Sequence, residues 1–122
     1  MKTVLLTGAC GGIGSAVARA LDAAGHHLLL LDLDPLALEA LDDGLQGDHT
    51  LVPFDLWRSG FDAYVRLAGL IQEDHGKLDA VINLAAVCGG LRPLAHADPT
   101  GWLQGLQVNH YEIGRASCRE RV

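Results

Sequence analysis

The sequence lacks an apolar run long enough to cross a membrane, because its best candidate, residues 28–33, is interrupted by Asp32. A leader peptide is not expected either, since the apolar N-terminal segment is short and runs directly into glycines. Only 3 cysteines occur among 122 residues, and no pair has CxxC spacing, which favours free thiols in a reducing compartment. We therefore expect a cytoplasmic protein with no membrane partner.

Basic residues are scarce as well. Lys and Arg number 9 against 15 Asp and Glu, which gives a formal net charge of −6 and argues against nucleic acid as a partner. One phosphate-bearing ligand remains compatible with this charge, because backbone N–H groups bind phosphate without Lys or Arg. The 6 histidines are scattered, and His26 and His27 have no partner at ligand spacing, so we expect surface positions and no metal site.

The alternation of apolar segments predicts the fold. Short β-rich runs alternate with longer segments in which apolar residues recur at helical spacing. Strands are expected at 2–7, 28–33, 50–54 and 78–84, and helices at 12–24, 34–43, 60–75 and from 98 onward. Apolar strands that alternate with helices indicate a parallel sheet covered on both faces, with right-handed connections. The fold class is therefore α/β, a Rossmann-like doubly wound sheet of about four strands in the order 3-2-1-4.

Two of these helices have a predicted inner face. The first helix is expected to bury Ile13, Val17, Ala20, Leu21 and Ala24. The third is expected to bury Phe61, Tyr64, Val65, Ala68 and Ile71.

A glycine-rich turn, TGACGGIG, connects the first strand to the first helix at residues 7–14. Glycines here permit a tight turn, a close approach of the backbone to a pyrophosphate and close packing of helix on strand. The N-terminus of the helix adds unsatisfied N–H groups and about half a positive charge. A tight turn without a ligand is the alternative interpretation. No Gly-Lys-Ser/Thr follows, which disfavours a nucleoside-triphosphate P-loop.

Asp32 is the second indication of a dinucleotide site, since it ends the second strand 18 residues after Gly14. A carboxylate at this place accepts hydrogen bonds from the two hydroxyls of an adenosine ribose and repels a 2′-phosphate. The alternative role, capping the next helix, suits Asp34 better, because Asp34 directly precedes Pro35. The expected cofactor is NAD, with NADP less favoured.

The spacing TGxxxGxG resembles the short-chain dehydrogenase/reductase family. Asp55-Leu56, after the third strand, is similar to the family's Asp-apolar pair beside the adenine. The segment DAVINLAA at 79–86 is similar to the family's Asn-Asn-Ala-Gly segment, with Asn83 and Ala85 matching and Leu84 and Ala86 departing. The stretch WLQGLQVN ends at Asn109, which the resemblance implies supports a proton relay to a catalytic lysine.

The resemblance implies an NAD-dependent oxidoreductase that acts on an alcohol/carbonyl small-molecule substrate, and a parent protein that is a homo-oligomer. It implies one catalytic residue in this chain, Asn109. The residues expected to bind the cofactor are Gly8, Cys10, Gly12, Ile13, Gly14, Asp32, Leu33, Asp55, Leu56, Asn83, Ala85 and Ala86.

The family's catalytic Tyr-x-x-x-Lys pair is absent. Lysine occurs only at Lys2 and Lys77, and neither Tyr64 nor Tyr111 begins such a motif. The last ten residues, IGRASCRERV, break the apolar period of the helix and resemble a translated sequencing adapter. We therefore expect an incomplete NAD(P)-binding domain at 1–111 and an adapter-derived tail at 112–122.

Two other functions remain open. The parent could be a non-catalytic module that binds NAD as a regulatory ligand. It could also be an epimerase or dehydratase of the related extended family, whose phosphate turn TGxxGxxG has its middle glycine one residue earlier than Gly12.

Overall fold

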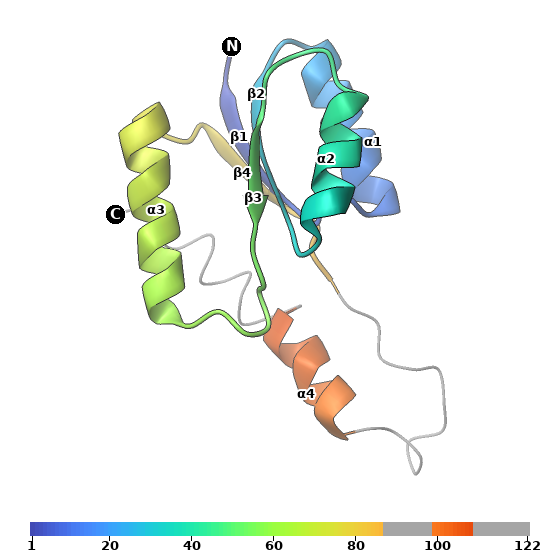
Figure 1. Ribbon diagram of the computed structural model, residues 1–122, viewed down its shortest axis with the longest axis vertical. Coiled ribbons are helices and arrows are strands. Elements are labelled where there is room, and N and C mark those ends of the chain that lie inside the picture. The colour runs from blue at the N-terminus through green and yellow to red at the C-terminus, as the bar shows by residue number, and fades with distance from the viewer. Residues whose placement is uncertain (87–98, 109–122) are drawn as a thin grey trace.

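In the computed structural model, residues 1–86 and 99–108 are described. Strands and helices alternate along the chain (Figure 1). The strands are β1 (Thr3–Thr7), β2 (His27–Asp32), β3 (Thr50–Pro53) and β4 (Ala80–Asn83). The helices are α1 (Gly12–Ala23), α2 (Pro35–Asp43), α3 (Phe61–His75) and α4 (Pro99–Leu106). Each predicted element is present, with ends that differ from the prediction by a few residues.

The four strands form one parallel sheet in the order β3-β2-β1-β4, as predicted. Helices α1 and α2 cover one face of the sheet and α3 covers the other (Figure 1). The sequence of β3 contained one objection to a strand, Pro53, which has no N–H to donate. The topology removes that objection, because β3 is an edge strand and is bonded only to β2.

Two apolar cores result, one on each face of the sheet. Consecutive residues of β2 point to opposite faces, so Leu28 and Leu30 pack under α1 and α2, whereas Leu29 and Leu31 pack under α3. All four are at most 2% exposed. This explains why the strand is apolar at every position and does not alternate.

The predicted inner faces of the helices are wrong in part. In α1 the buried residues are Gly14 and Ala18, whereas Ile13 is 71% exposed and Ala20 and Ala24 are also exposed. Close contact between α1 and the glycine turn brings small residues to the sheet and rotates Ile13 outward.

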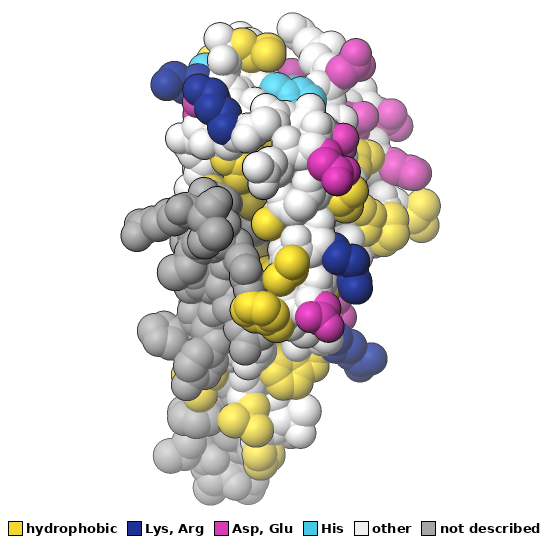
Figure 2. All heavy atoms as spheres, turned by 90° about the vertical axis from the view of Figure 1, so that its left-hand side faces the viewer, with side chains coloured by type: hydrophobic (Ala, Val, Ile, Leu, Met, Phe, Trp, Pro, Cys, Tyr) yellow, Lys and Arg dark blue, Asp and Glu magenta, His cyan; other side chains and the backbone are white. Residues whose placement is uncertain are grey.

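A similar correction applies to α3. Tyr64 and Ile71 are buried, but Phe61 and Val65 are 61% and 42% exposed. Leu70 is exposed too, so apolar side chains reach the surface on the side of the molecule that carries α3 (Figure 2). None of the helices in the described ranges is both long and apolar enough to span a bilayer.

Candidate functional site

The candidate site is a crevice at the carboxyl end of the sheet, where open α/β sheets bind ligands. Its cavity of about 370 Å³ is bounded by the glycine turn, the ends of β2, β3 and β4, and α4. Eight of the predicted residues line it, namely Gly8, Cys10, Asp32, Leu33, Asp55, Leu56, Ala85 and Ala86. The lining found within the described ranges contains no Lys and no Arg.

The glycines of the turn have different structural roles. Gly8 has φ +69°, and a Cβ there would lie 2.6 Å from backbone atoms of Leu84 and Ala85. A Cβ on Gly14 would lie 1.9 Å from the carbonyl oxygen of Gly8. By contrast, apart from Gly12, its two chain neighbours and the adjacent backbone of α1, no heavy atom of the described chain lies within 4 Å of the place where a Gly12 Cβ would be. Gly8 and Gly14 therefore permit close packing, and Gly12 keeps the approach to the helix open.

The N-terminus of α1 is available to an anion. Its N-cap is Gly11, which has no side chain to accept a hydrogen bond, and the first turn contains no acidic residue. Gly11, Gly12 and Ile13 are all exposed. The N–H groups of the first turn and the positive end of the helix dipole are therefore free of the usual capping oxygen, as a phosphate site requires.

Asp32 lies directly beside this turn. Its Oδ2 accepts a hydrogen bond from the backbone N–H of Cys10 at 2.9 Å, and its Oδ1 accepts one from Leu33 N–H at 2.7 Å. These two bonds orient the carboxylate at the mouth of the crevice. The capping role belongs to Asp34, as predicted, since its Oδ1 accepts from Leu36 N–H at 3.0 Å.

The environment of Cys10 keeps its thiol protonated. Partial burial, followed by the charge of Asp32, a hydrogen bond to Asp32 and the charge of Asp34, raises the pKa of Cys10 to about 11. Because the thiolate is the reactive form of cysteine, this environment disfavours a nucleophilic or redox-sensing role.

Thr7, which is 1% exposed, connects the ends of β1 and β4. Its Oγ1 accepts hydrogen bonds from Leu84 N–H at 3.2 Å and Ala85 N–H at 3.3 Å, and it donates one to Asn83 Oδ1 at 3.5 Å. The hydroxyl therefore fixes the backbone of the β4 end against the glycine turn.

We expect Thr7→Val to destabilise the fold by roughly 1–3 kcal/mol, because it leaves the buried Ala85 N–H without this acceptor, whereas the Leu84 N–H still donates to the Thr7 carbonyl oxygen. Thr7→Ser retains the hydroxyl and is the matched control. Urea denaturation followed by circular dichroism measures the difference. Equal midpoints for the valine and serine variants would contradict the assignment.

Asp55 organises the turn that follows β3. Its Oδ1 accepts hydrogen bonds from Trp57 N–H at 2.9 Å and Arg58 N–H at 3.1 Å. This brings Leu56, which is 9% exposed, and Trp57 to the wall of the crevice. Trp57 was not among the predicted residues, although it directly follows the Asp55-Leu56 pair at the carboxyl end of a strand, where the same reasoning applies.

The remaining predicted residues lie next to the cavity or outside the described ranges. Gly12, Ile13 and Gly14 begin α1, and Asn83 ends β4, but none of the four lines the cavity. Asn109 and the tail at 112–122 lie outside the described residues. Further lining residues that the sequence did not indicate are Gly11, Leu31, Phe54, Leu84, Gln104 and Val108.

Comparison with known proteins places this crevice in a family context. A family model described as "short chain dehydrogenase" matches residues 2–113. The chain is 31% identical to the short chain dehydrogenase/reductase dpfgG of Gibberella zeae, with 88% of the chain and 40% of that protein covered. It is 34% identical to the 2,3-dihydro-2,3-dihydroxybenzoate dehydrogenase of Bacillus subtilis, with 95% and 44% covered.

Solved structures agree with this match. A short chain dehydrogenase from Pseudomonas syringae superposes with a TM-score of 0.92 at 26% identity, covering 98% of this chain and 51% of that one. A metagenomic short-chain oxidoreductase in complex with NADP superposes with a TM-score of 0.89 at 28% identity, covering 98% and 55%. The chain thus spans less than half the length of these two curated relatives and about half the length of these solved structures.

Proposed function

This chain belongs to the short-chain dehydrogenase family, and we propose that it is the dinucleotide-binding part of an NAD-dependent oxidoreductase acting on an alcohol/carbonyl pair. The observation that carries the proposal is the adjacency of two features in one crevice. The helix N-terminus at the glycine turn has no capping side chain, and the Asp32 carboxylate bonds to the same turn at 2.9 Å.

The residues of the crevice fit the parts of the cofactor. The N–H groups at the start of α1 and the open space in front of Gly12 suit the pyrophosphate. Asp32 would hold the adenosine ribose, while Asp55 and Leu56 would bound the adenine. The nicotinamide end would extend past Asn83 and Ala85, and bound NAD would supply the hydride acceptor. This chain's residues bind and orient the dinucleotide.

We expect the chain to bind NAD at least about tenfold more tightly than NADP. In NADP the ribose 2′-hydroxyl carries a phosphate, so it cannot donate a hydrogen bond to Asp32, and the phosphate and the carboxylate repel each other. One hydrogen bond to a charged group contributes about 1.5–3 kcal/mol, and 1.4 kcal/mol corresponds to tenfold. The crevice lining within the described ranges offers no cation to offset the repulsion. Titration calorimetry of the chain with NAD and with NADP measures the ratio.

Asp32→Asn should sharply reduce the ratio of the affinity for NAD to the affinity for NADP. Asp34→Asn is the matched control, because it removes a charge two residues away, Asn is an equally good helix cap, and Asp34 does not line the cavity. Equal affinities in the unmodified chain, or tighter binding of NADP, would show that Asp32 does not hold the ribose.

A non-catalytic NAD-binding module is the second candidate function. The crevice fits this function as well, because binding NAD needs the phosphate turn and Asp32 and no catalytic group. Reading the source locus beyond codon 111 separates the two functions, because a downstream Tyr-x-x-x-Lys supports the oxidoreductase and its absence supports the module.

A further inference from the structure

A cluster of three histidines lies at the amino end of the sheet, away from the crevice. His27 begins β2, His49 precedes β3 and His75 ends α3. The ring of His27 has its centroid 4.8 Å from that of His75 and 5.9 Å from that of His49. The sequence-based expectation of scattered surface histidines is wrong here, because residues far apart in sequence meet only when the strands assemble. The described residues contain no His, Cys, Asp and Glu group suited to a metal ion.

His49 is held in one ring orientation by hydrogen bonds at both nitrogens. Its Nδ1 accepts a hydrogen bond from Leu28 N–H at 3.1 Å, so this nitrogen carries no proton. Its Nε2 donates to Asp22 Oδ1 at 2.8 Å, and the two side chains are only 1% and 7% exposed. A second proton, on Nδ1, would break the bond to Leu28 and leave a buried donor facing a donor.

Asp22 also connects His49 to the loop before β3. It also accepts hydrogen bonds from Gln46 N–H at 2.8 Å and Gly47 N–H at 2.9 Å. These two backbone bonds, followed by the bond to His49, lower the pKa of Asp22 to about 2. Asp22 therefore stays ionised in mild acid, and any change in this range must come from the histidines.

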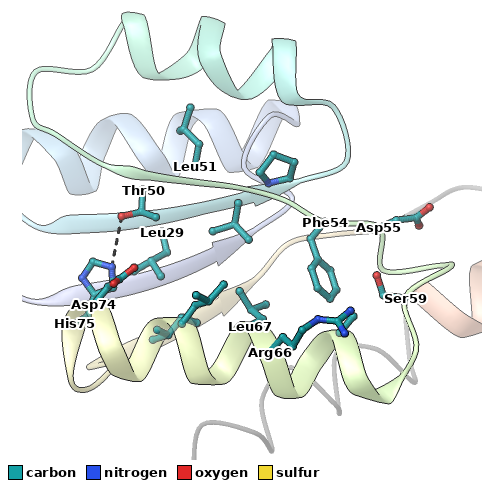
Figure 3. A pocket seen from close by; sticks show the side chains of 15 residues that line it. Leu29, Thr50, Leu51, Phe54, Asp55, Ser59, Arg66, Leu67, Asp74 and His75 are labelled. Carbon is teal, nitrogen blue, oxygen red and sulfur yellow. Dashed lines mark hydrogen bonds between the residues drawn. The ribbon is translucent and has the colours of Figure 1, made fainter.

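His27 and His75 share a single hydroxyl. The Oγ1 of Thr50, the first residue of β3, lies 3.2 Å from Nε2 of His27. It also lies 3.5 Å from Nε2 of His75, the contact that the dashed line in Figure 3 marks. A hydroxyl has one hydrogen, so it donates to one ring and accepts from the other. If both rings became cations, neither could accept, and two like charges would face each other 4.8 Å apart.

Water has access to this arrangement along an apolar groove. The groove, a cavity of about 480 Å³, runs between β3 and α3 and ends at Thr50 and His75 (Figure 3). Its walls include Leu29, Val52 and Leu67, none of which bonds to the imidazoles. At the end of the groove, the polar contact between Thr50 and His75 joins this end of β3 to α3.

We propose that the three histidines form a proton-sensitive latch, which holds the amino end of β3 and the last turn of α3 to β2 at neutral pH and releases them in mild acid. β3 is the element that should respond, because it has four residues and is bonded to the sheet on one side only. The charged groups at this end of the sheet are Asp22 on α1, Asp48 before β3, Asp74 on α3, and, beside β1, Lys2 and the Lys77–Asp79 ion pair.

The direction of the pH effect follows from His27. Burial, followed by the charge of His75, lowers the pKa of His27 below its ordinary 6.5, while a backbone bond at Asp48 and the Asp48 charge oppose this in part. The unfolded chain therefore takes up a proton at a higher pH than the folded chain does. The latch contributes its full stability above about pH 6.5 and loses it as the pH falls toward the folded-state pKa of His27.

Hydrogen exchange of the whole 122-residue chain, followed by mass spectrometry, tests the latch without cofactor. Between about pH 7.5 and pH 5.5, we expect protection factors at Thr50–Val52 and at the end of α3 to fall several-fold, because the unfolded chain takes up a proton on His27 at a higher pH than the folded chain does. Protection at Val4–Leu6 of β1 should change much less. In His75→Gln, which retains hydrogen bonding without titrating, the fall should be smaller, because the charge of His75 no longer lowers the pKa of His27 and the effect of burial remains.

His26→Gln is the matched control, because His26 lies outside the cluster, with its Nδ1 bonded to Lys2 N–H at 3.2 Å. Equal protection of β3 at both pH values, or an equal fall in His75→Gln and in the unmodified chain, would overturn the proposal. An NMR titration of the unmodified chain gives a second measurement that needs no variant. A His27 ring that titrates at the ordinary histidine value would also overturn it.

Discussion

Gly14→Ala is expected to abolish stable folding, whereas Gly12→Ala is expected to preserve the fold and remove dinucleotide binding. At Gly14 the added Cβ would lie 1.9 Å from the carbonyl oxygen and 2.8 Å from the carbonyl carbon of Gly8. Both neighbours are backbone atoms, so no side chain can rotate away. Either α1 must move off the sheet or the turn must change its path.

Two opposing contributions decide whether alanine at Gly14 raises or lowers the stability of the fold. Alanine inside a helix is favoured over glycine by about 1 kcal/mol. Overpacking in a rigid interior costs about 1–3 kcal/mol, and more where backbone must shift. The clash therefore outweighs the gain in helix propensity, and the loss is large beside the 5–15 kcal/mol that typically stabilises a domain.

At Gly12 there is no comparable steric overlap, so the gain in helix propensity is the larger contribution. Beyond Gly12, its neighbours and the adjacent backbone of α1, the described chain has no heavy atom within 4 Å of a Cβ there. Gly12 also has no positive φ, so alanine fits and is expected to be neutral or slightly stabilising. Its methyl group would instead occupy the open space in front of the helix N-terminus. We expect binding of NAD, and of ADP as a shorter probe, to be lost.

Thermal denaturation by circular dichroism and titration calorimetry with ADP separate the two effects. A Gly14→Ala chain that melts like the unmodified chain would show that α1 does not pack against Gly8 as described. A Gly12→Ala chain that binds ADP normally would place the pyrophosphate elsewhere in the crevice.

The parts of the fold that local sequence determines were predictable. Asp34-Pro35 predicted the start of α2, because a capping carboxylate and a fixed φ act within one turn. The apolar run of β2 predicted a buried parallel strand. The position of Asp32 beside the glycine turn followed from topology, since the carboxyl ends of adjacent parallel strands meet at one edge of the sheet.

Features that depend on several segments were not predictable in this way. The exposure of Ile13 results from the contact between Gly8 and Gly14, which the helical period alone does not contain. The histidine cluster requires β2, β3 and α3 to be placed together before any partner is visible. Gln104, which lies on α4, lines the crevice, and no spacing within α4 indicates that position.

The chain is expected to transfer no hydride between NAD and alcohols or ketones, even where it binds NAD. Reduction of a carbonyl leaves an oxyanion that needs a proton, and a positioned general acid typically contributes about 10²–10⁴-fold to the rate. The chain contains no Tyr-x-x-x-Lys pair. No tyrosine or lysine lies in the crevice lining that the structure describes.

Two such groups within the described residues, Tyr64 and Lys77, are badly placed for this role. Tyr64 is 3% exposed and packs in the core under α3. Lys77 pairs with Asp79 at 3.3 Å near the amino end of β4, the end of the strand opposite the crevice. Neither reaches a substrate beside a nicotinamide at the carboxyl end of the sheet.

The assay follows NADH absorbance with a panel of alcohols. The protein used is first shown by calorimetry to bind NAD, so that a loss of binding is not mistaken for a lack of catalysis. The Bacillus subtilis 2,3-dihydro-2,3-dihydroxybenzoate dehydrogenase with its own substrate shows that the assay detects turnover. NADH formation that rises in proportion to the concentration of this chain would contradict the expectation. In that case Asp32→Asn and Asp55→Asn would show whether one of the two crevice carboxylates supplies the acid.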